Sequence, residues 1–247
     1  MTGRVLLVGA GPGAADLLTI RARNALDQAT VVLYDRLVGS EILRLVPPTA
    51  EVIDVGKTPG ADHTQALILE LMGTLAIAGH VVVRLKGGDP MVFGRGGEEL
   101  TYLAERGIPA EVVPGITSAI GAPTSIGLPL TLRHLASGFA VVAGATLQAD
   151  SAARYASADT LVILMGAKAR VRIAKHLIGA GRPAEDPVAF IESGTTAEQR
   201  VTVTTLGEVA AGNVDANAPV VWVCGPVVNT LSSSLLPQPA VAIITRS

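Results

Sequence analysis

The chain has 247 residues, of which 49% are hydrophobic and 16% charged, and its formal net charge is -2. This length is enough to bury a sizeable core, in one large α/β domain or in two small ones. Aromatic residues make up 3% and no Lys/Arg-rich run occurs, so the basic patches and stacking platforms typical of nucleic-acid binding are missing.

The longest apolar stretches are strand-sized, far below the roughly 18 residues that a membrane-spanning helix needs. They are Val5–Ala10, Val31–Tyr34, Val81–Val83, Phe139–Ala143 and Leu161–Met165. The first of them breaks at once into glycines, which favours a first strand over a signal peptide. The single cysteine, Cys224, lies in an apolar run, so we expect a buried structural thiol and a cytoplasmic location.

The first half of the chain alternates between strand-like and helix-like segments. Strands are predicted at 5–8, 31–33 and 81–85, and helices at 16–28, 64–78 and 97–106. Such alternation predicts a largely parallel sheet that is covered on both faces.

Between residues 109 and 133 the composition shifts to Pro, Gly, Thr and Ser, which favours a long functional loop. A second α/β series follows, with strands near 139–143, 160–165, 187–191 and 219–224 and helices near 168–179 and 206–212. These features predict an α/β protein of two domains, 1–135 and 138–247.

A glycine-rich turn follows the first predicted strand, at Gly9-Ala-Gly-Pro-Gly-Ala14, and Asp35 ends the next strand. This pattern fits a dinucleotide-binding fingerprint with an acidic ribose ligand, and therefore an NAD-dependent dehydrogenase. It fits a plain tight turn equally well, because glycines serve backbone geometry and Pro12 removes an N–H group that could bind phosphate.

The segment from Arg84 to Glu99 is more informative. It begins at the carboxyl end of a strand, continues through a turn dense in glycine, and opens a helix whose first turn holds Glu98 and Glu99. Ligands of parallel sheets bind at such an edge. A crossover loop with two glutamates set for the helix dipole would explain the acids but not the three cations Arg84, Lys86 and Arg95.

Lys57 follows another strand in a turn rich in Gly and Pro, and His63 precedes the next helix. Standing alone, each would be a solvated loop residue or a helix-start hydrogen bond. The remaining histidines show no metal-ligand spacing with one another or with Cys224, so we expect no metal site.

Together these segments resemble the uroporphyrinogen-III C-methyltransferase family of the tetrapyrrole methylases. The resembling pieces run through most of the chain in the family's order: 8–13, 17–19, 31–38, 55–57, 84–99, 112–119, 127–131, 164–166, 192–195 and 198–200. The 84–99 segment is the most specific of them.

The resemblance implies a homodimer of two-domain α/β chains that binds S-adenosylmethionine in a cleft between the domains and releases S-adenosylhomocysteine. Domain 1–135 would form the tetrapyrrole side of this cleft, and domain 138–247 would complete the donor pocket. By resemblance, the donor pocket would be lined by Pro12, Gly87, Gly88, Asp89, Val92, Thr117, Ser118, Met165 and Gly194.

The resemblance also implies the reaction, which is methylation of uroporphyrinogen III to precorrin-2 through precorrin-1, on the route to siroheme or cobalamin. Asp35 and Lys57 would handle protons, while Arg95 and Glu98 would engage the tetrapyrrole. The sulfonium donor is already reactive, so we expect catalysis by alignment, followed by loss of a ring proton to a base such as Asp35. Arg84, Lys57, Lys86 and Arg133 could meet a substrate that carries many carboxylates.

Two departures from the family pattern bear on the substrate. Leu132 stands where the family usually has His, and Ala145 stands where it usually has the His of Thr-Gly-His. The alternatives left open are a methylase of a later corrin-pathway intermediate, the dehydrogenase, and a non-catalytic module that binds S-adenosylmethionine.

Overall fold

The structure is a computed structural model that describes residues 3–56, 65–231 and 243–244. Within these ranges the longest helices are too short or too polar to cross a membrane.

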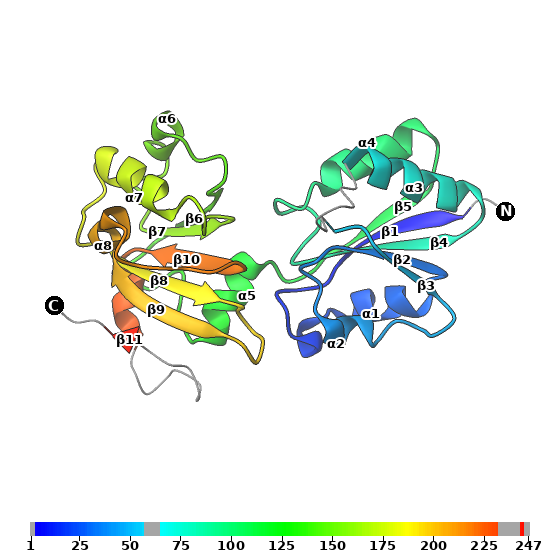
Figure 1. The fold of residues 1–247 in the computed structure, drawn as a ribbon, viewed down its shortest axis with the longest axis horizontal. Helices are drawn as coiled ribbons and strands as arrows, with labels where there is room; N and C mark the ends of the chain where they lie inside the picture. The colour runs from blue at the N-terminus through cyan, green and yellow to red at the C-terminus, as the bar shows by residue number, and fades with distance from the viewer. Residues whose placement is uncertain (1–2, 57–64, 232–242, 245–247) are drawn as a thin grey trace. The chain divides into compact units, whose positions relative to one another are not determined.

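The chain divides into two compact units, Met1–Thr117 and Ser118–Ser247 (Figure 1). This division lies earlier in the chain than the predicted one at 135–138. The difference arises from helix α5 (Ser118–Ser125), since its Ala119 and Ala122 are buried in a core cluster of the second unit. The Pro- and Gly-rich stretch therefore contains a helix, and this helix belongs to the second unit.

The first unit is built on a five-stranded parallel sheet with the strand order β3-β2-β4-β1-β5. Its strands are β1 (Arg4–Gly9), β2 (Val31–Tyr34), β3 (Glu51–Asp54), β4 (Val81–Lys86) and β5 (Ala110–Val113). Its helices are η1 (Ala15–Leu17), α1 (Ile20–Asp27), α2 (Ser40–Leu43), α3 (Gln65–Ile77) and α4 (Gly96–Glu105). The predicted parallel sheet is thus confirmed. The strand expected before Lys57 is β3, at one edge, and β5 is an addition at the other edge.

Successive residues of β4 point to opposite faces of this sheet. Val83 and Leu85 pack in the cluster that contains residues of α1 and α2, whereas Val82 packs in the cluster that contains residues of α3 and α4. Figure 1 shows these two helix pairs on opposite sides of the sheet. By the period of two in a strand, Arg84 and Lys86 share the face of Val82.

The second unit has a six-stranded mixed sheet with the order β11-β9-β8-β10-β7-β6. Its strands are β6 (Phe139–Ala143), β7 (Thr160–Leu164), β8 (Pro187–Glu192), β9 (Arg200–Thr205), β10 (Val220–Cys224) and β11 (Ile243–Ile244). Besides α5, its helices are α6 (Ala149–Ala152), α7 (Arg170–Gly179), α8 (Leu206–Ala211) and η2 (Pro226–Thr230). Because β10 runs antiparallel to both β7 and β8, strands β6, β7 and β8 end at the same edge.

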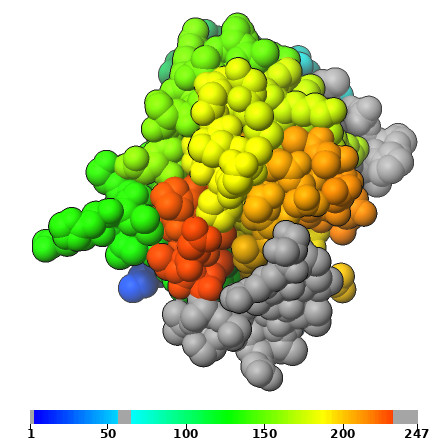
Figure 2. Space-filling model, turned by 90° about the vertical axis from the view of Figure 1, so that its left-hand side faces the viewer, coloured from blue at the N-terminus to red at the C-terminus, as the bar shows by residue number. Residues whose placement is uncertain are grey.

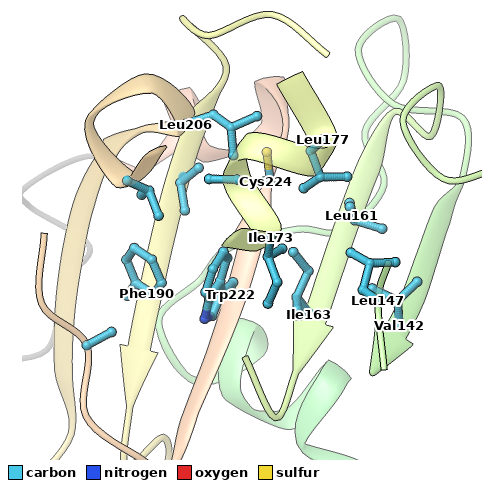
Figure 3. Close-up of a cluster of buried hydrophobic side chains, with 14 of the residues drawn as sticks. Val142, Leu147, Leu161, Ile163, Ile173, Leu177, Phe190, Leu206, Trp222 and Cys224 are labelled. Carbon is cyan, nitrogen blue, oxygen red and sulfur yellow. The ribbon is translucent and has the colours of Figure 1, made fainter. Parts of the chain in front are cut away.

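The core of the second unit is centred on Trp222 and Phe190 (Figure 3). Their rings pack edge to face, with the ring centroids 4.7 Å apart. Cys224 is completely buried in this cluster, as predicted. Its burial raises the pKa of the thiol to about 11, so the group stays protonated and unreactive at neutral pH.

Candidate active site

Three loops of the first unit meet at the carboxyl edge of its sheet, at glycines that follow or end neighbouring strands. A Cβ atom on Gly9 would lie 2.5 Å from the backbone nitrogen of Gly115, and one on Gly115 would lie 2.3 Å from the carbonyl oxygen of Gly88. No side chain fits at such distances. The glycines therefore allow the backbones after β1, β4 and β5 to touch.

The turn after β4 is fastened to this junction by hydrogen bonds. Gly88 and Gly11 exchange two backbone hydrogen bonds, at 2.7 and 3.1 Å. Gly88 has a φ of 68°, in the left-handed region that favours glycine. The carboxylate of Asp89 accepts from the N–H of Met91 at 2.8 Å and from the N–H of Gly115 at 3.0 Å. One aspartate thus joins the turn after β4 to the loop after β5.

Buried charges lie on the α3/α4 face of the same edge. Arg84 Nη2 donates to Asp35 Oδ1 at 2.6 Å, and Arg84 Nε donates to Glu99 Oε1 at 3.3 Å. Lys86 donates to the same Glu99 oxygen at 2.8 Å, and Gln65 approaches it at 3.4 Å. Two cations and two carboxylates therefore balance one another inside the unit.

This placement corrects the sequence-based expectation for two of the candidate cations. Arg84 and Lys86 are 2% and 3% exposed and are paired with carboxylates of the chain, so they do not present charge to a substrate. Burial, followed by the neighbouring Arg84, lowers the pKa of Lys86. Both cations instead shape the surroundings of Asp35 and Glu99.

Arg95 and Glu98 form a separate, exposed pair at the start of α4. Arg95 Nη2 lies 2.6 Å from Glu98 Oε2, and its Nε lies 3.0 Å from Glu98 Oε1. This hydrogen bonding raises the pKa of Arg95 and lowers the pKa of Glu98. Arg95 has a left-handed backbone, with a φ of 60°, and it caps α4. A non-glycine residue in this region is often held there for function.

The second unit places two further candidates at one edge of its sheet. Met165 follows β7 with a φ of 56° and is 53% exposed, although methionine is usually buried. Gly194 lies beyond β8, and a Cβ atom there would approach Ala122 Cβ to 2.6 Å. Gln199 Oε1 accepts hydrogen bonds from Ser125 Oγ at 2.7 Å and from the Thr195 N–H at 2.6 Å, which fixes the loop after β8 against α5.

The other predicted donor-pocket residues lie near these features, each within its own unit. Pro12 follows Gly11, Gly87 precedes Gly88, and Val92 donates its N–H to the Asp89 carbonyl at 3.2 Å. Thr117 ends the first unit, and Ser118 is the first residue of α5 in the second. Lys57 and His63 lie outside the described residues.

A turn with exposed apolar side chains precedes β6. Leu132 and Leu135 are 42% and 39% exposed, and His134 has a φ of 64°. In Figure 2, a part of the chain drawn in green, the colour of the residues around this turn, projects from the surface. A hollow of about 710 Å³ is lined by Thr131–Ser137 and Asp159, and Arg133 is exposed in it. Leu132, which departs from the family pattern, is thus a surface residue, as is Ala145.

Comparison with known proteins identifies the family. The family model described as tetrapyrrole (corrin/porphyrin) methylases matches residues 4–210, which is most of the chain and extends into both units. The chain belongs to the tetrapyrrole methylase family. The resemblance drawn from its motifs is therefore confirmed.

Characterised tetrapyrrole methylases are similar over nearly the whole chain. The uroporphyrinogen-III C-methyltransferase of Methanocaldococcus jannaschii is 45% identical over 94% of this chain and 100% of its own length. The S-adenosyl-L-methionine-dependent uroporphyrinogen III methyltransferase of Methanosarcina barkeri is 46% identical over 92% of both chains. Siroheme synthase 2 of Aeromonas hydrophila is 47% identical, and the chain spans about half (49%) of its length.

Solved tetrapyrrole methylases share the fold. A uroporphyrin-III C-methyltransferase from Thermus thermophilus complexed with S-adenosylhomocysteine aligns with a TM-score of 0.82 and 47% identity, over 92% of this chain and 94% of that one. The cobalt-precorrin-4 methyltransferase aligns with a TM-score of 0.77 and 24% identity, over 91% of this chain and 95% of that one, so it shows the fold alone. The predicted α/β fold class is confirmed.

Glu99 is the site residue that the sequence-based argument undervalued. It lies four residues before Leu103, which is fully buried, so both share one face of α4. The alternation of Val82, Arg84 and Lys86 along β4 is a second signal, because the two cations continue an apolar face. Read together, these patterns indicate that Glu99 on α4 and the cations Arg84 and Lys86 on β4 are all buried.

Proposed function

We propose that this chain is a uroporphyrinogen-III C-methyltransferase that converts its substrate to precorrin-2 through precorrin-1. The observation that carries the proposal is the 45% identity to the M. jannaschii enzyme over that enzyme's full length. Identity is 24% with the cobalt-precorrin-4 methyltransferase, which leaves a later corrin-pathway intermediate as the weaker alternative. The product would serve siroheme or cobalamin synthesis.

S-adenosylmethionine is the methyl donor, and residues of both units fit it. In the first unit we assign Pro12, Gly87, Gly88, Asp89, Val92 and Thr117 to the donor pocket, and in the second Ser118, Met165 and Gly194. The left-handed backbone at Gly88 directs peptide groups out of the regular sheet, and the exposed side chain of Met165 offers an apolar contact at a sheet edge. Bound there, the donor supplies an electrophilic methyl group on sulfur.

The chain's own residues would then orient the tetrapyrrole and take up a proton. After a ring carbon has gained a methyl group, the macrocycle is cationic and must lose a proton. Asp35 suits this task, because its side chain is 31% exposed at the end of β2 and is ion-paired to Arg84. Lys57 is assigned to the same proton handling by its match to the family pattern at 55–57.

Arg95 is assigned to a carboxylate of the tetrapyrrole, with Glu98 as the partner that orients it. Arg95 is 53% exposed and its guanidinium stays charged, so it suits binding of an anion and does not suit the role of a base. Arg133, exposed in the second unit, is a further cation for a substrate of this charge.

We further propose that the enzyme works in the cytoplasm as a homodimer. The single cysteine, which cannot form an internal disulfide, agrees with a reducing compartment. Leu132 and Leu135, which are exposed in the turn before β6, are suited to contact a second copy.

The direct test is an assay of the purified chain with S-adenosylmethionine and uroporphyrinogen III, in which the mass of the product is followed. A gain of two methyl groups supports the proposal, and a chain active only on a later corrin intermediate would support the alternative. Titration with S-adenosylhomocysteine and with NAD separates the dehydrogenase alternative, because tight NAD binding without affinity for S-adenosylhomocysteine would contradict the methyltransferase assignment.

A further inference from the structure

Four charged side chains of the first unit form one connected series of ion pairs. Arg84 reaches Asp35 with Nη2, at 2.6 Å, and Glu99 with Nε, at 3.3 Å. Lys86 approaches the same Glu99 oxygen at 2.8 Å. Asp35 follows β2, the two cations lie on β4, and Glu99 lies on α4. The series therefore ties three elements together at the carboxyl edge of the sheet.

Burial changes steeply along this series. The side chains of Arg84, Lys86 and Glu99 are 3%, 4% and 0% exposed, whereas that of Asp35 is 31% exposed. The series thus begins in the interior and reaches solvent at Asp35, the residue assigned to proton transfer.

Stability alone does not account for this arrangement. Buried ion pairs cost desolvation, and apolar residues of similar volume often stabilise a fold as well or better. Val82 on the same face of β4 shows that apolar residues fit there. In addition, Glu99 Oε2 is buried and has no hydrogen-bond partner among the residues that the structure describes, and such an atom calls for an explanation.

We propose that Arg84 and Glu99 are positioning residues that hold the Asp35 carboxylate in place for proton abstraction. The inference rests on the proposed function. In that step a C–H bond of the methylated, cationic ring breaks, its electron pair returns to the ring, and the proton moves to a carboxylate oxygen of Asp35.

The contacts explain how the positioning works. Arg84 uses two different nitrogens for its two partners, so the plane of its guanidinium group is fixed. It also approaches the carbonyl oxygens of Leu33 and Leu85 at 3.4 Å. Lys86 donates to the same oxygen of Glu99 as Arg84 does, which holds the Glu99 carboxylate by a second cation. A lysine at position 84 would keep the charge but has one nitrogen, so it cannot serve both carboxylates in this geometry.

The test is a double-mutant cycle of Arg84→Lys and Asp35→Asn, with kcat for methyl transfer to uroporphyrinogen III as the readout. In the wild-type background we expect Arg84→Lys to lower kcat about tenfold to a hundredfold, because misplacement of a reacting group costs rate. The affinity for S-adenosylhomocysteine should stay within about twofold. In the Asp35→Asn background the same change should lower kcat less than about twofold further, since the base it positions is gone.

Two further variants separate positioning from folding. Glu99→Gln keeps the shape of the side chain but removes the charge that orients Arg84, so it should show the same coupling to Asp35→Asn if Arg84→Lys does not fold. Arg182→Lys is the matched control, because Arg182 is also a buried arginine, 4% exposed and 2.7 Å from Asp186, but lies in the second unit. We expect it to lower Tm and to leave kcat unchanged.

Each outcome has a distinct meaning. Equal losses of kcat in both backgrounds, for Arg84→Lys and for Glu99→Gln alike, would overturn the positioning role. An active Asp35→Asn variant with unchanged kcat would overturn it too, because there would be no base to position. A wild-type chain that binds S-adenosylhomocysteine but does not methylate uroporphyrinogen III would overturn the proposed function, and the inference with it.

Discussion

Asp89 joins two loops of the first unit through the two oxygens of one carboxylate. It accepts from the N–H groups of Met91 and Gly115, and Gly115 touches the backbone of Gly9 and Gly88. A single side chain therefore sets the shape of the edge to which we assign the first unit's part of the donor pocket.

We predict that Asp89→Ala abolishes binding of S-adenosylhomocysteine and lowers the free energy of unfolding by about 1–3 kcal/mol, because two backbone donors lose their acceptor. Calorimetric titration and urea unfolding measure the two effects. Asp159→Ala is the control, since Asp159 likewise accepts two hydrogen bonds, both from Ser137 in the second unit. Unchanged affinity in Asp89→Ala would mean that the donor pocket lies elsewhere.

Arg95→Ala should raise KM for the tetrapyrrole about tenfold, as expected for loss of a charge-assisted hydrogen bond, and should spare donor binding. Steady-state kinetics with each substrate varied in turn measures this split. Arg106→Ala, at the other end of α4, is the matched exposed control. If Arg95→Ala weakened binding of the donor instead, the assignment of Arg95 to the tetrapyrrole would be wrong.

Cys224 gives stability a pH dependence whose sign is fixed by its pKa. Burial raises this pKa from 9.0 to about 11, so above pH 9 the unfolded chain loses a proton that the folded chain keeps. The protonated thiol therefore contributes to the free energy of unfolding below pH 9. This contribution is lost as the pH rises toward 11, and the free energy of unfolding falls by at most about 3 kcal/mol. Urea unfolding across this range should show a flatter decline for Cys224→Ala than for the wild type, and parallel declines would contradict the assignment.

Among the elements, the close backbone contacts after β1, β4 and β5 require glycine where the loops meet. Gly115→Ala should cost about 1–3 kcal/mol of unfolding free energy or more, since its Cβ would overlap the Gly88 carbonyl. Gly97→Ala is the control, because nothing lies within 4 Å of a Cβ there and alanine has a higher helix propensity than glycine. A Gly115→Ala variant as stable as the wild type would show that the loops are not in contact.

The elements that the sequence predicted are those with a strong, regular pattern. Central strands such as β1 and β2 read as continuous apolar runs, because both of their faces are covered. The edge strand β5 was missed, since it is short and carries the exposed, charged Glu111. Helix α5 was missed because Pro123 lies inside it, and proline usually breaks helices.

The candidate site was predicted only in part, for a related reason. Glycine spacing and charge located the segment 84–99, but the partners of its charged residues depend on tertiary structure. Pairing of Arg84 with Asp35 and Glu99 needs β2, β4 and α4 to be adjacent, and adjacency is a property of the folded unit. The alternation along β4 indicates that Arg84 and Lys86 are buried, but it does not indicate which carboxylates they pair with.

In the whole molecule, each of the two units contributes residues to the proposed chemistry. We assign the proton-handling residue Asp35 and the substrate-binding Arg95 to the first unit, and Met165 and Gly194 of the donor pocket to the second. Similarity to tetrapyrrole methylases extends into both units, which agrees with a role for both units in binding and catalysis.

The central claim is that this chain attaches methyl groups from S-adenosylmethionine to carbon atoms of uroporphyrinogen III. The most direct measurement is a reaction with donor labelled by carbon-13 in its methyl group, followed by NMR of the isolated product. We predict two labelled methyl groups per macrocycle, each bonded to a ring carbon. Label on an oxygen or nitrogen atom, or no label in the macrocycle while the chain binds S-adenosylhomocysteine, would contradict the account.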